Sequence, residues 1–243
     1  SIREVKYMKW FKRIVLILLA IILVTGIVFT VQGYLFYREQ SSDENITAKI
    51  KEIQESENYV TLEELPQSYL NAVVAVEDHR FYNHGAIDII AIGRAIVTNI
   101  KNFDFVEGGS TITQQIAKNI FFTQDESMVR KIAEIFMAFK LESMYDKDEI
   151  LEIYVNNSYF GYGYTGIKEA CNGYLGKDPM EMTLYDASLL AGVPNSPYYY
   201  SPRSNIDLAT KRQQKVLSSM VKYNYISQEE ADEALNTPSP IVE

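Results

Sequence analysis

Cysteine and positive charge are both scarce in this sequence. The 243 residues include one cysteine, Cys171, which excludes an intramolecular disulfide framework and a zinc site built from several cysteines. The formal net charge of −9 argues against a protein that binds nucleic acid through a basic surface. Low-complexity segments and repeats of fixed period are also lacking, and 47% of the residues are hydrophobic, so the chain can bury a core. At this length we expect one folded unit and a smaller part.

The charge is distributed unevenly along the chain. Residues 1–13 hold five basic residues against Glu4, a net charge of +4, which leaves −13 for the remainder. The next 18 residues, Ile14 to Val31, are uncharged and apolar, which is the length of a membrane-spanning helix. A cleaved signal peptide is the alternative, but its apolar core is usually only ~7 to 15 residues long. By the positive-inside rule, we predict a cytoplasmic tail over 1–13, a single transmembrane helix over 14–36 and an extracytoplasmic remainder at the cell membrane.

The sequence predicts a mainly α fold after this anchor. Residues 37–60 are strongly charged and poor in large apolar residues, so we expect a solvated stalk or linker. Beyond it, Thr61, Asp88 and Ser127 each precede apolar residues at helical spacing, as N-caps do. Further helices are predicted over 147–156, 166–174, 181–192, 207–222 and 227–235. Alternating strand patterns are scarce, so residues 61–243 are expected to form one helical domain.

A dense polar cluster, AVEDHRFYNHG, covers residues 75–85 at the end of an apolar helix. Glu77 and Asp78 follow directly after VVAV, so at least one carboxylate should emerge at the edge of the core. Partial desolvation there makes a carboxylate a better proton acceptor near neutral pH. From these residues alone, an acidic pair that merely ends a helix is the alternative. His79 and His84 are five residues apart, which does not match a two-histidine metal site on one helix face.

A second cluster, EGGSTITQQIAKN, covers residues 107–119. Two glycines before a helix capped by serine or threonine expose backbone N–H groups, which suits a phosphate or pyrophosphate. Gln114 and Lys118 share one helix face, with Gln115 beside them, and add amide donors and a cation. The spacing of a P-loop is absent, so ATP or GTP binding is not indicated. An ordinary turn before an amphipathic helix is the alternative.

The third cluster, RKIAE, places Arg130 and Glu134 one turn apart on the helix that Ser127 is expected to cap. Such a pair can be a simple ion pair worth about 0.2–0.5 kcal/mol. It also offers a second carboxylate next to a cation.

Five segments in order resemble the five motifs of the peptidoglycan glycosyltransferase family, glycosyltransferase family 51: EDHRFYNHG, GGSTITQQIAKN, RKIAE, KDEILEIYVNNSYFG and GIKEACNGYLGK. The resemblance covers nearly all of the part that follows the stalk. It implies a lysozyme-like helical domain that polymerises lipid II into β-1,4 glycan strands, with inversion and release of undecaprenyl pyrophosphate. The family occurs behind a membrane anchor alone or as the glycosyltransferase domain of class A penicillin-binding proteins, and we expect the first, monofunctional form here.

The resemblance also assigns roles to individual residues. Glu77 would be the general base that deprotonates the 4-hydroxyl of the acceptor sugar, and Glu134 matches the second catalytic glutamate. Asp78, Phe81 and His84 match the rest of the first motif and are expected to support Glu77. Binding of the sugars and the pyrophosphate is expected from Gly109, Ser110, Thr111, Gln114, Gln115, Lys118, Arg130 and Lys131.

Two positions depart from the family pattern in ways that reduce the positive charge of the expected site. Ala133 and Glu126 stand where several relatives carry a basic residue. Either Arg130 and Lys118 therefore carry more of that charge, or a divalent cation such as Mg or Mn does. No other cofactor is expected, and the metal question stays open at this stage.

The expected partners are lipid II, the growing lipid-linked glycan strand and the membrane, with transpeptidases or division and elongation proteins as further candidates and no nucleic acid. Apolar residues near the first two motifs should lie at the bilayer surface or in the core: Phe103, Phe105, Val106, Phe121 and Phe122. Two other functions stay open, a lysozyme-like enzyme that cleaves peptidoglycan and a non-catalytic scaffold that binds lipid II.

Overall fold

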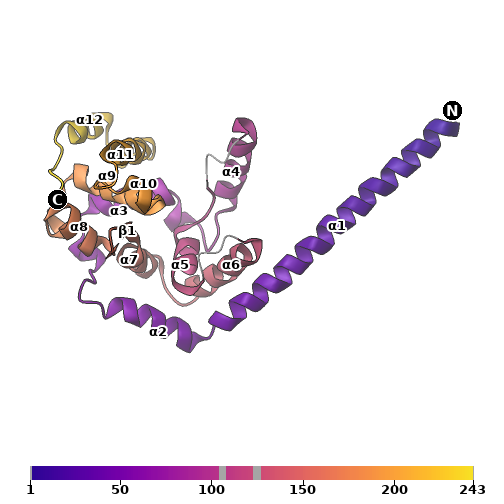
Figure 1. Cartoon of the computed structure of the whole chain (residues 1–243), viewed down its shortest axis with the longest axis horizontal. Helices are drawn as coiled ribbons and strands as arrows, with labels where there is room; N and C mark the ends of the chain where they lie inside the picture. Colours follow the sequence, from indigo (N-terminus) through magenta and orange to yellow (C-terminus); the bar gives the residue numbers. More distant parts are fainter. Residues whose placement is uncertain (1, 104–107, 123–126, 243) are drawn as a thin grey trace.

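The computed structural model describes residues 2–103, 108–122 and 127–242, and it confirms the mainly α fold (Figure 1). The α-helices are α1 (Ile2–Gln40), α2 (Asp43–Gln54), α3 (Gln67–Glu77), α4 (Ile89–Asn102), α5 (Ile112–Phe121), α6 (Met128–Glu142), α7 (Lys147–Asn157), α8 (Ile167–Leu175), α9 (Leu184–Gly192), α10 (Pro197–Tyr200), α11 (Ile206–Lys222) and α12 (Gln228–Asn236). Short 3₁₀ helices are η1 (Leu62–Glu64), η2 (Phe81–Asn83), η3 (Pro179–Glu181) and η4 (Val193–Asn195). The strands β1 (Tyr159–Gly161) and β2 (Tyr164–Thr165) pair antiparallel.

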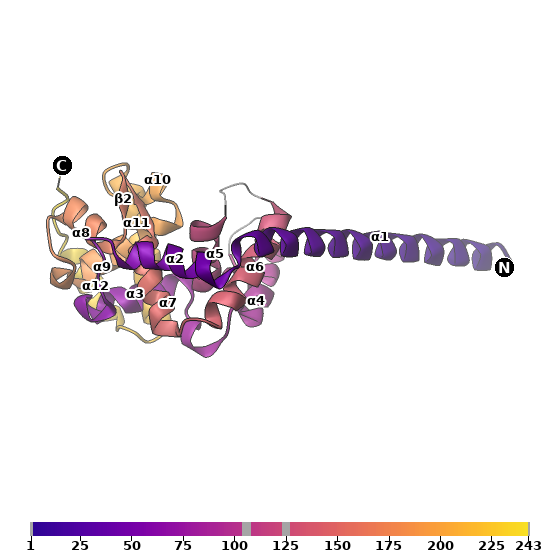
Figure 2. The same ribbon diagram turned by 90° about the horizontal axis from the view of Figure 1, so that it is seen from below.

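Helix α1 extends from the body as a long arm that ends at the N-terminus (Figures 1 and 2). The stretch Trp10–Gln40 within it is long and apolar enough to cross a membrane. The predicted span of 14–36 therefore lies inside a longer helix. At 1.5 Å per residue, the 39 residues of α1 extend over ~58 Å, well beyond the ~30 Å of a bilayer's hydrocarbon core.

The last turns of α1 pack against α6, the helix that carries the RKIAE cluster. Gly33 allows the close approach, because a Cβ atom there would lie 2.5 Å from Cγ2 of Ile132 and 3.0 Å from the carbonyl oxygen of Val129. Beside it, the ring centroids of Tyr34 and Phe136 are 5.3 Å apart in an edge-to-face arrangement. The anchor helix and α6 therefore form one packed unit.

Residues 37–60 differ from the expected solvated stalk. The first four complete α1, and after two residues α2 begins, capped by Ser42, whose hydroxyl accepts from the backbone N–H of Asn45 at 3.2 Å. Ile46 and Ile50, one turn apart, are 0% and 1% exposed and join the main core. Two isoleucines at this spacing are enough to dock a helix whose other residues are mostly polar, and this docking corrects the expectation of a spacer.

Two groups of packed helices position the polar motifs. Helix α3 packs against α9 and α11, and α5 packs against α6 and α7. The predicted caps of α4 and α6 are confirmed, since Asp88 accepts from the N–H of Ala91 at 2.8 Å and Ser127 accepts from the N–H of Arg130 at 3.1 Å. These caps place the starts of α4 and α6 on either side of α5 in sequence.

Helix α4 keeps most of its apolar side chains out of the core. Ile89, Ile96 and Ile100 are 74%, 55% and 66% exposed, and Phe103 at the end of the helix is 97% exposed. Phe121 and Phe122, by contrast, are buried in the main core. Phe105 and Val106, the other two residues of the expected apolar group, lie outside the described residues.

Candidate active site

Glu77 is the last residue of α3, and its carboxylate is held at both oxygens. Nη2 of Arg212 donates to Oε1 at 3.0 Å, and Nε2 of Gln115 donates to Oε2 at 2.9 Å. The side chains of Arg212 and Glu77 are 8% and 7% exposed, so the ion pair is largely shielded from water. Each carboxylate oxygen has two lone pairs and keeps room for a further donor. A carboxylate fixed in this way can take a proton from a hydroxyl group placed beside it.

Arg212 is contributed by α11, and the sequence analysis missed it. Its Nε donates to the carbonyl oxygen of Gly192 at 3.3 Å, and a Cβ atom on Gly192 would lie 2.8 Å from Cγ of Arg212. The guanidinium also lies over the ring of Tyr200, with Cζ 5.7 Å from the ring centroid. One signal was present: at helical spacing, Arg212 shares the face that buries Ala209, Val216 and Met220, where a charge needs a partner.

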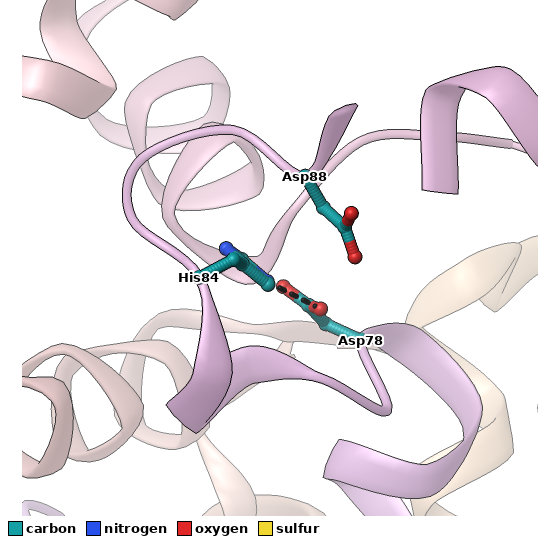
Figure 3. A group of neighbouring side chains, drawn as sticks. All are labelled: Asp78, His84 and Asp88. Atoms are coloured by element: carbon teal, nitrogen blue, oxygen red, sulfur yellow. Dashed lines mark hydrogen bonds and ion pairs between the residues drawn. The ribbon is translucent and has the colours of Figure 1, made fainter. Parts of the chain in front are cut away.

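The loop after α3 is braced by a second set of polar contacts (Figure 3). Nε2 of His84 lies 2.8 Å from Oδ1 of Asp78, whose other oxygen accepts from the backbone N–H of Ile112 at 3.2 Å. Arg80 forms an ion pair with Asp88, with Nε donating to Oδ2 at 3.0 Å. These contacts tie the loop to the starts of α4 and α5.

The two members of this brace that titrate have opposite shifts. Burial lowers the pKa of His84, but the hydrogen bond and charge of Asp78 outweigh it, so that the pKa is raised. Burial raises the pKa of Asp88, but the hydrogen bonds from Arg80 and from the N–H of Ala91 outweigh it and lower the pKa to about 2. Phe81, the remaining residue of the first motif, is buried, with Nζ of Lys147 lying 4.4 Å from its ring centroid.

Asp78, His84 and Asp88 are also close enough to be considered as metal ligands, with candidate ligand atoms within 4.8 Å of one another (Figure 3). The arrangement does not favour a cation. The guanidinium of Arg80 already supplies positive charge to Asp88, and the near oxygen of Asp78 is engaged by His84. We therefore assign this cluster to hydrogen-bonded bracing of the loop.

The start of α5 is closed by a reciprocal cap. The hydroxyl of Thr111 accepts from the N–H of Gln114 at 3.2 Å and donates to the carbonyl oxygen of Ala86 at 2.8 Å, while Oε1 of Gln114 accepts from the N–H of Thr111 at 3.0 Å. Both side chains are buried, so Gln114 does not share an open face with Lys118. The N–H groups of Ile112 and Gln114 are already bonded to side chains, which leaves less of the helix N-terminus for an anion than the sequence suggested.

Positive charge gathers around Ser110 from α6. Nζ of Lys131 donates to the hydroxyl of Ser110 at 2.8 Å and lies 2.7 Å from Oε2 of Glu134, and Nε of Arg130 lies 2.9 Å from Oε1 of the same carboxylate. Two cations therefore share one buried carboxylate, which leaves one net positive charge. Lys118 is half-buried and has no ion pair or hydrogen bond among the described residues.

The remaining motif positions lie close to this arrangement. Gly109 lies against α4, where a Cβ atom would lie 3.1 Å from Cα of Ile92. Ala133 is fully buried, so a longer basic side chain there would have to leave the core. Glu126, the other departure from the family pattern, lies outside the described residues. Through Gln115 and Ser110, the structure connects both predicted catalytic glutamates to the first turns of α5 and the loop before it.

A family model described as Transglycosylase matches residues 43–221. The chain belongs to the transglycosylase family. The match includes α2 and all five motif segments, and it confirms the family resemblance on which the motif assignment depended. It begins within the segment expected to be a linker, in agreement with the packing of Ile46 and Ile50 in the core.

Relatives of this transglycosylase unit include much longer proteins. Penicillin-binding protein 1A of Aquifex aeolicus is 42% identical over 180 residues, 74% of this chain and 25% of the relative. Penicillin-binding protein 1F of Bacillus subtilis is 42% identical over 177 residues, 73% of this chain and 25% of the relative. The chain thus spans about a quarter of the length of these relatives. A crystal structure of penicillin-binding protein 1A from Haemophilus influenzae matches with a TM-score of 0.47 and 24% identity over 76% of this chain and 18% of that one.

Proposed function

We propose that this chain is a peptidoglycan glycosyltransferase that polymerises lipid II into β-1,4 glycan strands, with inversion and release of undecaprenyl pyrophosphate. The observation that carries the proposal is the buried carboxylate of Glu77, held by Arg212 and Gln115 inside the first motif of a transglycosylase family member. Membership of that family supports a glycosyl transfer, and the geometry of Glu77 suits the removal of one proton from a hydroxyl group.

In the proposed reaction, Glu77 takes the proton of the 4-hydroxyl of the acceptor N-acetylglucosamine. The oxygen bonds to C1 of the lipid-linked N-acetylmuramic acid as the bond from C1 to the pyrophosphate oxygen breaks, so the electron pair leaves with the pyrophosphate. Lys131, Arg130 and Lys118 supply positive charge for this leaving group, and Glu134 holds the first two in place. Electrostatic stabilisation of a leaving anion by fixed charges is a large contribution to catalysis in such sites.

A membrane location fits substrates that carry lipid tails. Helix α1 provides a stretch that is apolar enough to cross a bilayer, and the basic residues before it favour a cytoplasmic N-terminus with the catalytic unit outside. The exposed isoleucines of α4 and the exposed Phe103 support contact of this unit with the bilayer surface. Lipid II and the growing glycan strand are the proposed substrates, and cell-wall transpeptidases or division and elongation proteins are the proposed protein partners.

The test is polymerisation of purified lipid II by the full chain in detergent, with Glu77→Gln as the decisive variant. Wild type should form glycan polymer, and Glu77→Gln should form none, because the amide cannot take the proton. Glu233→Gln, which changes a carboxylate on α12, is the matched control and should polymerise like wild type. Polymer formation by Glu77→Gln at the wild-type rate would contradict the role of this residue.

The same assay separates the two alternative functions. Release of soluble fragments from finished peptidoglycan, without polymer from lipid II, would indicate a cleaving enzyme. Binding of lipid II without turnover, with or without added Mg or Mn, would indicate a scaffold. Adding a metal chelator to the wild-type reaction tests the divalent cation directly.

A further inference from the structure

A cavity of about 420 Å³ lies outside the set of motif residues, between the turn of the β1–β2 hairpin, α10 and the start of α11. Its lining is Tyr162, Tyr198, Tyr199, Ser204, Asn205 and Leu208. The three tyrosines are unusually open for large aromatic side chains, at 56%, 80% and 57% exposed. Aromatic rings around an open cavity with a few polar groups are typical of ligand sites.

The chemistry of the lining narrows the ligand to an uncharged polar molecule. None of the six residues carries a charge, so the cavity offers no partner to a pyrophosphate or to an ionic peptide group. Tyrosine rings offer flat apolar faces with a hydroxyl at the edge, and Ser204 and Asn205 add further hydrogen-bonding groups. Sugar rings have a matching surface, because their C–H groups form apolar faces and their hydroxyl groups lie around the rim.

The nearest arginine is already committed to the protein. Arg203 lies over the ring of Tyr162, with Cζ 5.8 Å from the centroid, but its nitrogens donate to the hydroxyl of Tyr164 at 3.0 Å and to the carbonyl oxygens of Gly173 and Val242 at 2.7 and 2.9 Å. Its charge therefore braces the hairpin and gives the cavity a rigid wall. Tyr162 itself has φ of 55°, a backbone conformation that is rare for an aromatic residue and that marks a position under functional constraint.

The cavity is connected to Glu77 through two of its own elements. Leu208 lies one turn before Arg212 on α11, and Tyr199 is followed on α10 by Tyr200, whose ring lies under the Arg212 guanidinium. Arg212 in turn binds Glu77. A sugar chain that passes Glu77 on the side of Arg212 would therefore reach the tyrosine-lined cavity next.

We infer that this cavity is a glycan-binding subsite, in which Tyr198 and Tyr199 stack on sugar rings of a strand that extends beyond the residues reacting at Glu77. The inference rests on the proposed function for the identity of the strand. Its ligand chemistry, a neutral β-1,4-linked amino sugar, follows from the lining alone.

The experiment measures binding of a chitin hexasaccharide, which has neither lipid nor pyrophosphate, to the full chain in detergent micelles by calorimetry. Wild type should bind it, and Tyr198→Ala/Tyr199→Ala should bind at least about tenfold more weakly, because two stacking faces are lost. Tyr198→Phe/Tyr199→Phe keeps both rings and should stay within about threefold of wild type. Met180→Ala, which removes an exposed apolar side chain outside the cavity, is the control, and thermal unfolding of each variant confirms that it is folded.

Three results would overturn the subsite: no hexasaccharide binding by wild type, equal binding by the double alanine variant, or loss of binding in Glu77→Gln to the same extent as in that variant. Failure of the proposed function gives a different pattern. Wild type would then fail to polymerise lipid II while hexasaccharide binding still depended on Tyr198 and Tyr199.

Discussion

Arg212 and Glu77 are 135 residues apart in the sequence, yet Nη2 of Arg212 donates to Oε1 of Glu77 across 3.0 Å in a site almost closed to water. The contact joins α11 to the end of α3, two helices that also pack against each other. The proposed general base is thus positioned by the last third of the chain as well as by its own motif. A pair of this kind has consequences for stability and for activity.

Replacing Arg212 by glutamine should destabilise the fold strongly, because it leaves the carboxylate of Glu77 buried without a counter-charge. We expect the free energy of unfolding to fall by about 3–5 kcal/mol, measured by urea denaturation followed by circular dichroism. Lys211→Gln changes the exposed neighbour and should stay within about 0.5 kcal/mol of wild type. Adding Glu77→Gln to Arg212→Gln should restore part of the loss, and strict additivity of the two changes would contradict a direct pair.

The two histidines of the chain, His79 and His84, should titrate on opposite sides of the ordinary value. Burial and the nearby Arg94 lower the pKa of His79, whereas Asp78 outweighs the burial of His84 and raises its pKa. Nuclear magnetic resonance of the imidazole C–H groups should therefore show two separate transitions. In Asp78→Asn the transition of His84 should move to lower pH while that of His79 moves much less.

The raised pKa of His84 also sets the direction of a stability effect. Protonated His84 stabilises the fold fully below its unfolded pKa of ~6.5, and this contribution is lost as the pH rises through the higher folded pKa. The difference in unfolding free energy between wild type and His84→Gln should accordingly shrink as the pH rises above neutral. A difference that grows with pH would contradict the pairing with Asp78.

Asp88 should contribute stability that disappears in acid. Its pKa is lowered from 3.8 to about 2, so its stabilising charge is present above the unfolded value and is lost as the pH falls through about 2. Each pKa unit corresponds to about 1.4 kcal/mol, so the difference in unfolding free energy between wild type and Asp88→Asn should decrease by about 2 kcal/mol between pH 5 and pH 2. A difference independent of pH over this range would show that the ion pair with Arg80 does not hold in solution.

Gly33 and Gly26 offer a matched pair of changes on one helix. A valine at position 33 would collide with Ile132 and with the backbone of Val129, whereas a side chain at position 26 meets nothing within 4 Å. Gly33→Val should loosen the packing of α1 on α6 at a cost of about 1–3 kcal/mol, and Gly26→Val should not. Hydrogen exchange of the α6 amides reads this out, and equal protection of α6 in the two variants would contradict the packed unit.

Local signals in the sequence predicted most of the helices and both sides of the site. Asp88 and Ser127 cap the helices they were expected to cap, because a short polar side chain before an apolar periodic segment acts within three residues of itself. Lys131 lies beside Ser110 and Glu134, as the order of the motifs implied. Such features depend on neighbours in sequence or on motifs that the family shares.

The features that escaped prediction depend on distant contacts. Arg212 is one basic residue on a long amphipathic helix, and only the folded structure brings it to Glu77. Ile46 and Ile50 are two apolar residues in a charged segment, too few to outweigh its polar composition, yet they dock α2 on the core. Gln114 was expected to face a ligand, but its amide satisfies the backbone N–H of Thr111, a local alternative that the capping pattern already contained.

Helix α1 continues without a break from Ile2 to Gln40 and is packed on α6 at its end. The orientation of the catalytic unit about the helix axis is therefore encoded in the number of residues in the helix. Inserting one residue between Gly26 and Gly33 would turn everything beyond it by ~100° and shift it by ~1.5 Å along the axis. A small change in length would thus alter which side of the unit faces the membrane surface much more than it would alter the height of the unit above that surface.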